Sequence, residues 1–405
     1  MTSTQSVDET TTPASPYRFG FVLQQVLGWV GGTQALKRFV QDDHSVLATW
    51  NEITFVQAGG WVERLPLPRG ARGAIRGALQ TRQGLDAPAI PIGARRVAAR
   101  YDALLFNMPG LCRAAPDLIT RVPTVLVTDV TPRQLAEMEE YYGKLGGLQA
   151  GYNERKHRAY VRAYQRLRLV VSYSEWARDS LIADYGVPAE KVIVMPFSID
   201  LDKWTAAPAG ARAALLATPG ALPRILFVGG DFTRKGGPQL LEWFLAHGQG
   251  RCELHVVTRT PPEASAAPGL HFHTDLETND PRLIELYHDS HIFALPTLAD
   301  CYSVAAIEAM ATGLPVILTN VGGAGEIVTD GVDGYSIAPQ DDAALAQRLD
   351  ELISDPVRAI WMGEAARQTA ERRFDARDFA SALLGQMKAL ADERRAQLAG
   401  RASTR

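Results

Sequence analysis

The stretch LPTLADCYSVAAIEAMATGLPVILTNVGG, residues Leu295–Gly323, contains a complete strand–helix–strand pattern. A short apolar run ends near Leu295, a helix is expected to begin near Ser303, and a second apolar run follows at Pro315–Leu318. Continuous apolar strands separated by helices are typical of a parallel sheet covered on both faces. The stretch therefore predicts an α/β fold.

The same alternation runs along the whole chain and falls into two groups. The first group of expected strands is Arg18–Leu23, Glu52–Val56, Ala103–Phe106, Thr124–Thr128, Leu169–Ser172 and Val192–Met195. The second group is Arg224–Val228, Glu253–Val257, Ile292–Leu295, Pro315–Leu318 and Tyr335–Ile337. Amphipathic helices are expected between them, among others at Arg133–Tyr142 and Pro238–Ala246. This pattern predicts two doubly wound sheets with a ligand cleft at the carboxyl ends of their strands.

Composition supports two domains joined by a hinge. A chain of 405 residues is long enough for two or three domains of about 150 residues each. The segment Asp202–Pro223 is rich in Ala, Pro and Gly, so the hinge is placed within Phe197–Pro223. We expect four parts: a disordered leader over 1–16, a first Rossmann-like domain over 17–205, a second over 206–374, and a helix with a tail over 375–405 that packs back on the first domain.

Charge and cysteine content exclude several classes of protein. The chain has 42 Lys and Arg against 45 Asp and Glu, a net charge of −3, which does not fit a general nucleic-acid binder. Its three cysteines lie far apart, which excludes a disulfide scaffold and a sulfur-ligated zinc site. The polar first residues are not a secretory signal, and no apolar run approaches the ~18 residues of a membrane span. These features predict a cytoplasmic protein.

The stretch ILFVGGDFTRKGGPQLLEWF, Ile225–Phe244, carries the first set of candidate ligand-binding residues. Gly229 and Gly230 follow an apolar strand and allow the backbone to approach a ligand, and Arg234 and Lys235 come just before a helix. Two cations near a helix N-terminus are a plausible diphosphate site. The spacing matches neither the GxGxxG fingerprint nor the P-loop. The alternative is a glycine-bounded turn with two solvated cations.

Two carboxylates carry the second set of candidate residues. Glu308 lies on the edge of the apolar stripe of its helix, where a carboxylate is costly unless it is hydrogen-bonded. It can accept hydrogen bonds from two adjacent ribose hydroxyls. Asp300 lies eight residues earlier, a span that fits the distance from a ribose to a sugar beyond its diphosphate. The alternatives are a capping role for Asp300 and a structural arginine partner for Glu308.

These motifs resemble those of the retaining glycosyltransferases of family four, which have two facing Rossmann-like domains, the GT-B architecture. The family's E-x7-E motif followed by EAMA-x-G-x-P-V corresponds to Asp300-x7-Glu308 and EAMATGLPVI. VGGDFTRKGG matches its basic loop, and GGAGEIVTDGVDGYSI, Gly322–Ile337, matches its E-x-x-x-[DN]-G-x-x-G segment. Ser174–Asp200 resembles the stretch before the family's hinge. The resemblance spans about residues 20 to 380 and is most specific in the second half.

The resemblance implies roles residue by residue. Lys235 matches the lysine that holds the donor diphosphate, Glu308 the acid that binds ribose, and Asp300 the acid near the sugar hydroxyls. The amides of Cys301–Ser303 would approach the same sugar. The implied donor-binding set is Gly229, Gly230, Asp300, Cys301, Tyr302, Ser303, Val304 and Glu308.

Two departures from the family pattern alter this assignment. Asp300 stands where the family has Glu, which shortens the reach toward the sugar. Gly230 stands where the family has Arg, so Arg234 is expected to take over the role of that arginine. Arg234 and Lys235 are therefore expected to be catalytic, together with Asp129 of the first half of the chain.

The first half contributes two candidate positions. Gly31 and Gly32 lie between an expected strand and helix, where the family has a glycine-rich loop facing the cleft near the diphosphate and acceptor; a plain turn is the alternative. Asp129 ends an expected strand and would orient the acceptor hydroxyl or the donor sugar. Its alternative is capping the helix that begins near Pro132.

Two further clusters contain residues that could bind a ligand. The segment Arg64–Arg100 contains eight arginines and one acid, Asp86, and is a candidate for membrane-surface or anionic-acceptor binding, the alternative being a solvated loop. His271 and His273 share one face of an expected strand, but the sequence places no further ligand at suitable spacing, so they are interpreted as structural.

The sequence as a whole predicts a retaining, metal-independent enzyme that moves a sugar from an NDP-sugar to a glycan, lipid-linked or small-molecule acceptor. No cofactor and no metal are expected, and contact with the inner membrane face would be peripheral. The alternatives are a non-catalytic nucleotide-sugar-binding protein and, on the same architecture, an epimerase or phosphorylase.

Overall fold

The computed structural model describes residues 15–25, 29–54, 98–142, 152–262 and 266–403. Its strands form two six-stranded sheets in which every pair of neighbouring strands is parallel. The first sheet, in the order β2-β1-β3-β4-β5-β6, consists of β1 (Tyr17–Gln25), β2 (Val46–Thr54), β3 (Ala103–Phe106), β4 (Thr124–Thr128), β5 (Leu169–Ser172) and β6 (Val192–Val194). The second sheet, in the order β12-β11-β10-β7-β8-β9, consists of β7 (Arg224–Val228), β8 (Glu253–Val257), β9 (Leu270–His273), β10 (Ile292–Leu295), β11 (Val316–Thr319) and β12 (Gly334–Ile337).

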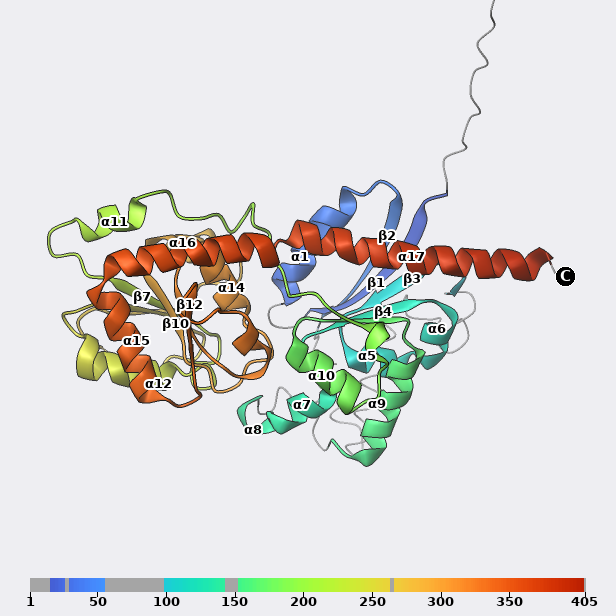
Figure 1. The fold of residues 1–405 in the computed structure, drawn as a ribbon, viewed down its shortest axis with the longest axis horizontal. Coiled ribbons are helices and arrows are strands. Elements are labelled where there is room, and N and C mark those ends of the chain that lie inside the picture. The colour runs from blue at the N-terminus through green and yellow to red at the C-terminus, as the bar shows by residue number, and fades with distance from the viewer. Residues whose placement is uncertain (1–14, 26–28, 55–97, 143–151, 263–265, 404–405) are drawn as a thin grey trace, which may run out of the picture.

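Helices cover both faces of each sheet, and the two sheets belong to separate lobes (Figure 1). Those before β7 are α1 (Trp29–Gln41), α5 (Pro109–Ala114), α6 (Pro116–Arg121), α7 (Pro132–Glu137), α8 (Glu139–Tyr142), α9 (Glu154–Arg166), α10 (Glu175–Ala183), the 3-10 turn η2 (Ala189–Lys191) and α11 (Ala211–Leu216). Those after β7 are α12 (Gly237–Trp243), the π-helical turn η3 (Phe244–Gly248), α13 (Pro281–Asp289), α14 (Val304–Ala311), the 3-10 turn η4 (Gly322–Glu326), α15 (Asp342–Ser354), α16 (Pro356–Arg373) and α17 (Ala376–Ser403).

The strands in the middle of both sheets are apolar because helices cover both of their faces. All residues of β3, β4, β5, β10 and β11 are buried. A strand of this kind cannot alternate apolar and polar residues, since neither face meets water. The α/β architecture with two doubly wound sheets is therefore confirmed.

Several elements differ from the sequence expectation. The single helix expected over Arg133–Tyr142 is wrong, because the helix ends at Glu137 and α8 starts afresh at Glu139. The helix expected over Pro238–Ala246 ends at Trp243 and continues as a π-helical turn. The short helices α5, α6 and α11 were not predicted. Each has six residues, which is less than two helical turns and too short to show the repeat of apolar residues that identifies an amphipathic helix.

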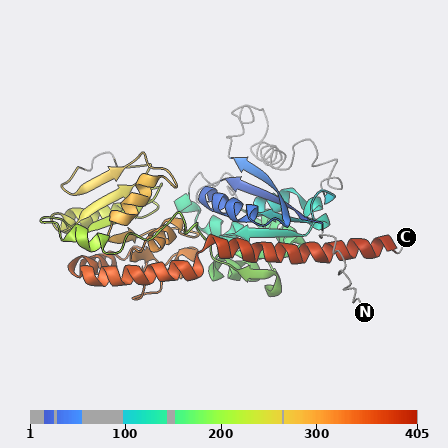
Figure 2. The same ribbon diagram turned by 90° about the horizontal axis from the view of Figure 1, so that it is seen from above.

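Helix α17 leaves the second lobe and runs along the first, where it packs against α1 (Figures 1 and 2). Its basic side chains are anchored to the first lobe, with Lys388 Nζ 2.6 Å from Asp43 and Arg395 2.6 Å from the buried carboxylate of Asp102. The two arginine partners of Asp102, Arg18 and Arg395, hold the pKa of that carboxyl at about 2, although burial opposes them. The chain therefore ties its last helix to its first sheet.

A second contact joins the two lobes. The carboxylate of Glu326, in η4, accepts hydrogen bonds from the backbone N–H groups of Glu175 and Trp176 at 2.8 and 2.7 Å. These groups form the first turn of α10, which Ser174 also caps. An acidic residue of the second lobe thus completes the N-terminus of a helix in the first, a position that favours negative charge.

Candidate active site

The loop between β7 and α12 is held in place by a glycine that no other residue can replace without strain. Gly236 has a φ of +79°, and a Cβ atom there would lie 1.9 Å from the carbonyl oxygen of Pro296. The loop therefore packs directly on the segment that follows β10. Gly229 serves the same packing, because its own Cβ would lie 2.8 Å from that of Lys235, whereas the space beside Gly230 is open.

This packing brings Lys235 to Asp300, 65 residues later in the chain. The Lys235 ammonium contacts the Asp300 carboxylate, and both side chains are nearly buried, with exposed fractions of 14% and 6%. Burial lowers the pKa of Lys235, and the charge of Arg234 lowers it further, while Asp300 opposes both. The expectation that Asp300 is merely a helix cap is wrong, since α14 begins after Ser303 and Asp300 pairs with Lys235.

Arg234 is also buried rather than solvated. One of its terminal nitrogens donates to the carbonyl oxygen of Ala299 at 2.7 Å, and its Nε lies 3.7 Å from a carboxylate oxygen of Asp231. Among the described residues, that buried Nε has no hydrogen-bond partner. The alternative of two solvated cations is therefore wrong, and Arg234 retains a donor that an anionic ligand can use.

Tyr142, the last residue of α8, reaches this site from the first lobe. Its ring lies over the Arg234 guanidinium, and its hydroxyl accepts a hydrogen bond from the backbone N–H of Cys301 at 3.3 Å. The same hydroxyl is 3.3 Å from Cys301 Sγ. Burial raises the pKa of Tyr142 well above its ordinary value, so the hydroxyl stays protonated. Sequence analysis missed Tyr142, because no local motif records a contact made across the two lobes.

Glu308 is buried on α14, and within the described part of the chain no cation donates a hydrogen bond to it. The Tyr287 hydroxyl donates to one of its carboxylate oxygens at 3.1 Å. Burial raises the pKa of Glu308 to about 8, against the effect of that hydrogen bond. The alternative of a structural arginine partner is wrong for the described chain, where Glu308 makes no salt bridge. A buried carboxylate with spare acceptor capacity remains available for hydroxyl donors.

Asp129 follows β4 and is not a helix cap. The cap of α7 is Thr131, whose side chain accepts from the backbone N–H of Gln134 while Gln134 bonds back to Thr131. Burial, with a smaller contribution from the charge of Asp300, raises the pKa of Asp129 to about 6. The capping alternative is therefore wrong, and the fold brings the Asp129 and Asp300 carboxyl groups within electrostatic range across the lobes.

The expectation that Gly31 and Gly32 form a loop is wrong, because both residues lie inside the first turns of α1. A Cβ at Gly32 would lie 2.7 Å from the ring of Phe197, so this glycine allows the helix to pack closely on the segment leading to the second lobe. A Cβ at Gly31 would lie 3.6 Å from the side chain of Asn279, which also donates to Gln34 at 3.2 Å. Both glycines sit where the lobes meet, for reasons of packing.

The remaining donor-binding candidates surround the N-terminus of α14. Ser303 precedes the helix but its side chain caps nothing, and among the described residues its hydroxyl and that of Tyr302 are buried without hydrogen-bond partners. Val304 begins the helix and packs partly on the core. Cys301 is a buried free thiol whose pKa burial raises well above the ordinary value.

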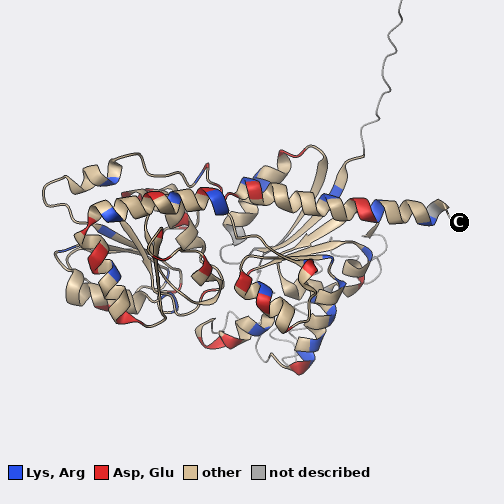
Figure 3. Ribbon diagram, in the orientation of Figure 1, with Lys and Arg blue, Asp and Glu red and all other residues tan. Residues whose placement is uncertain are grey.

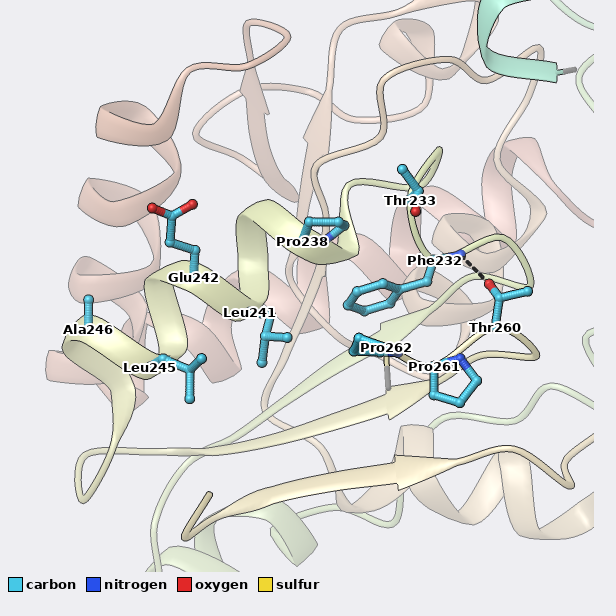
Figure 4. Close-up of a pocket in the computed structure, with 10 residues that line it drawn as sticks. All are labelled: Phe232, Thr233, Pro238, Leu241, Glu242, Leu245, Ala246, Thr260, Pro261 and Pro262. Carbon is cyan, nitrogen blue, oxygen red and sulfur yellow. Dashed lines mark hydrogen bonds between the residues drawn. The ribbon is translucent and has the colours of Figure 1, made fainter. Parts of the chain in front are cut away.

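An open pocket of about 770 Å³ lies beside the loop between β7 and α12 (Figure 4). Its apolar lining comes from α12 and from the segment after β8, with Phe232, Leu241 and Pro262 drawn around it. The Phe232 N–H donates to Thr260 Oγ1 at 3.0 Å and so joins the two segments. None of the expected catalytic side chains lines this pocket, so it is distinct from the Lys235–Asp300 site.

The basic stretch over Arg64–Arg100 lies outside the described residues except for its last three positions. Elsewhere charged residues lie mostly on helices and loops rather than on strands (Figure 3). Among the described helices, none combines the length and the apolar character that crossing a bilayer requires.

Two family models match this chain. Residues 49–203 match the family model described as Glycosyltransferase Family 4, and residues 222–355 match that described as Glycosyl transferases group 1. The two matches account for most of the chain between residues 49 and 355, including the loop of Lys235 and the helix of Glu308. The chain belongs to the group 1 glycosyltransferases of family four.

Relatives of this family-four chain include curated proteins with assigned substrates. It is 32% identical over 235 residues to D-inositol 3-phosphate glycosyltransferase of Xylanimonas cellulosilytica, covering 53% of this chain and 55% of that one. It is 37% identical over 100 residues to glycogen synthase of Mycobacterium tuberculosis, covering 25% and 24% of the two chains. The chain thus spans about half the length, or less, of these curated relatives.

Solved structures share its fold over nearly the whole length. Sucrose-phosphate synthase from Thermosynechococcus elongatus has a TM-score of 0.69 at 17% identity, covering 92% of this chain and 99% of that one. Anabaena HepE in complex with UDP-glucose has a TM-score of 0.63 at 17% identity, with the same coverage. This family-four chain therefore has the GT-B fold, as expected.

Proposed function

We propose that this chain is a glycosyltransferase that moves a sugar from a nucleoside diphosphate sugar to an acceptor hydroxyl. The observation that carries the proposal is the buried pair of cations, Arg234 and Lys235, of which Arg234 keeps an unused Nε donor. Buried charges are costly unless a partner completes them, and a diphosphate is an anion of the right size to do so. The Anabaena relative in fold was solved with UDP-glucose and with UDP, which supports this class of ligand.

The other buried polar groups supply the remaining donor contacts in this proposal. Glu308 would accept hydrogen bonds from the ribose hydroxyls, and its raised pKa reflects a carboxylate that lacks those donors in the free protein. The free hydroxyls of Tyr302 and Ser303 would face the sugar. Asp300 would contact the sugar hydroxyls with the oxygen that does not face Lys235.

The proposed chemistry uses charge stabilisation at the leaving group. As the anomeric C–O bond breaks, negative charge grows on the diphosphate, and Arg234 and Lys235 stabilise it from fixed positions. The departing phosphate takes the proton of the acceptor hydroxyl on the same face of the sugar, so the anomeric configuration is retained and neither a protein nucleophile nor a metal is required. Asp129 would orient the acceptor hydroxyl.

The two lobes would divide the substrates between them. Residues 206–374 would hold the donor, and residues 17–205 would hold a glycan, lipid-linked or small-molecule acceptor, with closure of the lobes excluding water. The excess of arginine over Arg64–Arg100 supports an additional contact with anionic membrane surfaces. Salt-sensitive binding to anionic liposomes is the test of that contact, and no binding at low salt would refute it.

The proposal is tested by donor binding followed by nucleotide release. Purified protein is screened by thermal shift with UDP-, GDP-, ADP- and dTDP-sugars, where a ligand at 100 times its Kd adds about 2.7 kcal/mol of stability. The donor that shifts the Tm is then incubated with candidate acceptors, and free nucleotide is measured. We expect one donor class to bind and release nucleotide, and the Glu308→Ala variant to lose the shift.

The outcomes separate the alternatives. If a donor binds but neither transfer nor slow hydrolysis releases its nucleotide under any condition, the chain is a non-catalytic nucleotide-sugar-binding protein. No shift with any donor, or an equal shift in Glu308→Ala, would refute the assigned site.

A further inference from the structure

Three histidines and a glutamate gather on β8 and β9, the last two strands at one edge of the second sheet. Glu253 and His255 lie two residues apart on β8, and His271 and His273 lie two apart on β9. Residues two apart share a face of a strand, and His255 is the direct parallel neighbour of His271. The register therefore places all four side chains on one face of the sheet.

The side chains are close enough to act as a unit. The His255 and His271 rings stack with their centroids 4.6 Å apart, and His255 Nδ1 is 3.2 Å from His273 Nε2. His255 Nε2 is 3.5 Å from a carboxylate oxygen of Glu253. One ligand atom from each of Glu253, His255 and His271 lies within 4.8 Å of the other two.

We propose that Glu253, His255 and His271 bind a divalent transition-metal ion, with Zn²⁺ as the first ion to test. Two imidazole nitrogens and one carboxylate oxygen form a known zinc ligand set in which water takes the fourth position. The ligand atoms of a tetrahedral zinc site lie about 3.3 Å apart, given Zn–N and Zn–O lengths near 2.0–2.1 Å. The three atoms lie within 4.8 Å of one another in the free protein, so the exposed His271 side chain would have to rotate to reach that spacing.

His273 would orient the buried ligand rather than bind the ion. When His255 donates its Nδ1–H to His273 Nε2, the Nε2 lone pair of His255 points toward Glu253. A histidine ligand commonly donates its other ring N–H in this way, which fixes the ring and its tautomer. His273 is thus a positioning residue for His255.

Arg224 is the competing cation that the site must accommodate. Its Nε donates to Glu253 Oε2 at 2.8 Å, and its terminal nitrogen is 3.6 Å from Asp289. Oε2 is also the oxygen that lies 3.5 Å from His255 Nε2, so a metal ion would either share Oε2 with Arg224 or bind Oε1, while Asp289 shares the charge of Arg224. The arginine would lower the affinity of the site without blocking it.

The location of the site indicates a structural role. β9 is the edge strand of the second sheet, and among the described strands it pairs with β8 alone. A metal bridging the two strands would fasten this edge, so metal binding should raise the Tm and chelation should lower it. From the sequence, His271 and His273 were interpreted as structural because no further ligand lies near them in the chain. The further ligands in the structure, His255 and Glu253, come from the adjacent strand β8.

The test is calorimetric titration of ZnCl₂ into tag-free, chelator-treated protein. We expect one Zn²⁺ per chain, binding at least tenfold weaker in His271→Ala, and a loss of 10- to 100-fold in His273→Gln, as is usual for the residue that orients a ligand. His271 is exposed, so its replacement leaves the fold intact, and His247→Ala, an exposed histidine outside the cluster, is the matched control. Co²⁺ binding, followed by its visible spectrum, reports the ligand set independently.

The inference is overturned if the wild type binds no stoichiometric Zn²⁺. It is also overturned if His271→Ala binds as tightly as the wild type, or if His247→Ala loses affinity to the same extent. None of these readouts depends on transfer activity, so failure of the proposed function would leave this test unaffected.

Discussion

The ring of Tyr142 lies over the guanidinium of Arg234, with 4.4 Å between the guanidinium carbon and the ring centroid. The two residues come from different lobes, and the Tyr142 hydroxyl also holds the backbone N–H of Cys301. Tyr142 thus covers one cation and one amide that the proposed donor requires. If the donor binds these two groups, Tyr142 competes with it, so we predict that donor binding displaces this side chain.

Removing this side chain should tighten donor binding. Tyr142→Ala gives up a cation–π contact of about 0.5–2 kcal/mol and a hydrogen bond of about 0.5–1.5 kcal/mol that compete with the donor. The two contacts together amount to about 1–3.5 kcal/mol, and about 1.4 kcal/mol corresponds to tenfold in Kd, so we expect the donor found by the screen to bind with a Kd that is tighter by about fivefold or more. Titration calorimetry measures this, and Tyr141→Ala, the exposed neighbour, is the control. A weaker Kd in Tyr142→Ala would instead make the ring part of the donor site.

Variants of the Lys235–Asp300 pair can distinguish a catalytic role of Lys235 from a role in stability. Lys235→Ala should lower kcat by about 10²–10³, the range for loss of one charge-stabilising group at a reacting centre. It should also lower the free energy of unfolding, because it leaves the Asp300 carboxylate buried without its cation.

The double variant Lys235→Ala/Asp300→Asn removes the buried unpaired charge. We expect its Tm to recover toward the wild type while kcat stays low, with Lys191→Ala as a control outside the site. Recovery of kcat together with Tm would mean that Lys235 acts only through stability.

The sequence was sufficient for most of the fold because the central strands are apolar on both faces. β3, β4, β5 and β10 were located to the residue, since a buried strand is a short apolar run bounded by polar residues. The edge strand β9 was harder, because its residues alternate and carry two histidines. The split between α7 and α8 was missed because Met138 breaks the helix with no Pro or Gly to signal it.

The site was predictable where one segment carried the signal, and not where two segments meet. Lys235, Asp300 and Glu308 lie in motifs of adjacent residues, so their types and spacing were visible. That Lys235 pairs with Asp300, and that Tyr142 covers Arg234, depends on how loops after different strands pack. The histidine cluster was missed for the same reason, since the register of β8 against β9 brings His255 beside His271.

Nucleotide binding should depend on the ionisation of Glu308. Burial raises the pKa of this carboxyl from 4.5 to about 8, so at pH 7 it is mostly protonated in the free protein. Ribose hydroxyls donate best to the carboxylate, so binding releases a proton. We therefore expect binding to tighten as the pH is raised: Kd falls by up to about tenfold for each pH unit up to about pH 8, and is constant above that pH. Glu308→Gln should bind weakly with a flat profile, whereas the exposed Glu285→Gln should follow the wild type.

Asp129 should contribute a pH-dependent cost to stability. Burial raises its pKa from 3.8 to about 6, with Asp300 adding to the shift. Because its pKa is higher in the folded than in the unfolded protein, protonated Asp129 contributes to the free energy of unfolding. That contribution is complete below the unfolded pKa of 3.8 and is lost as the pH rises through about 6. The ceiling is about 3 kcal/mol, from roughly two pKa units at 1.36 kcal/mol each.

Asp129→Asn mimics the protonated carboxyl, so it should raise the Tm at pH 7.5 and leave it nearly unchanged at pH 4. Thermal denaturation at the two pH values measures this, with the exposed Asp117→Asn as control. An equal change at both pH values would argue against a buried carboxyl. If Asp129 also orients the acceptor, the stabilised variant should lose turnover.

Two glycines of the loop after β7 should respond differently to the same change. At Gly236 a Cβ would meet the Pro296 carbonyl oxygen at 1.9 Å on a backbone with a φ of +79°, so Gly236→Ala should move the loop off the segment after β10. It should lower the Tm and weaken donor binding together, since that packing brings Lys235 to Asp300. At Gly230 the nearest atom to a Cβ is Arg259 Nε at 3.9 Å, so Gly230→Ala should keep the wild-type Tm. A donor Kd weakened in Gly230→Ala at unchanged Tm would mean that the ligand approaches this backbone closely, whereas an unchanged Kd would place the diphosphate away from Gly230.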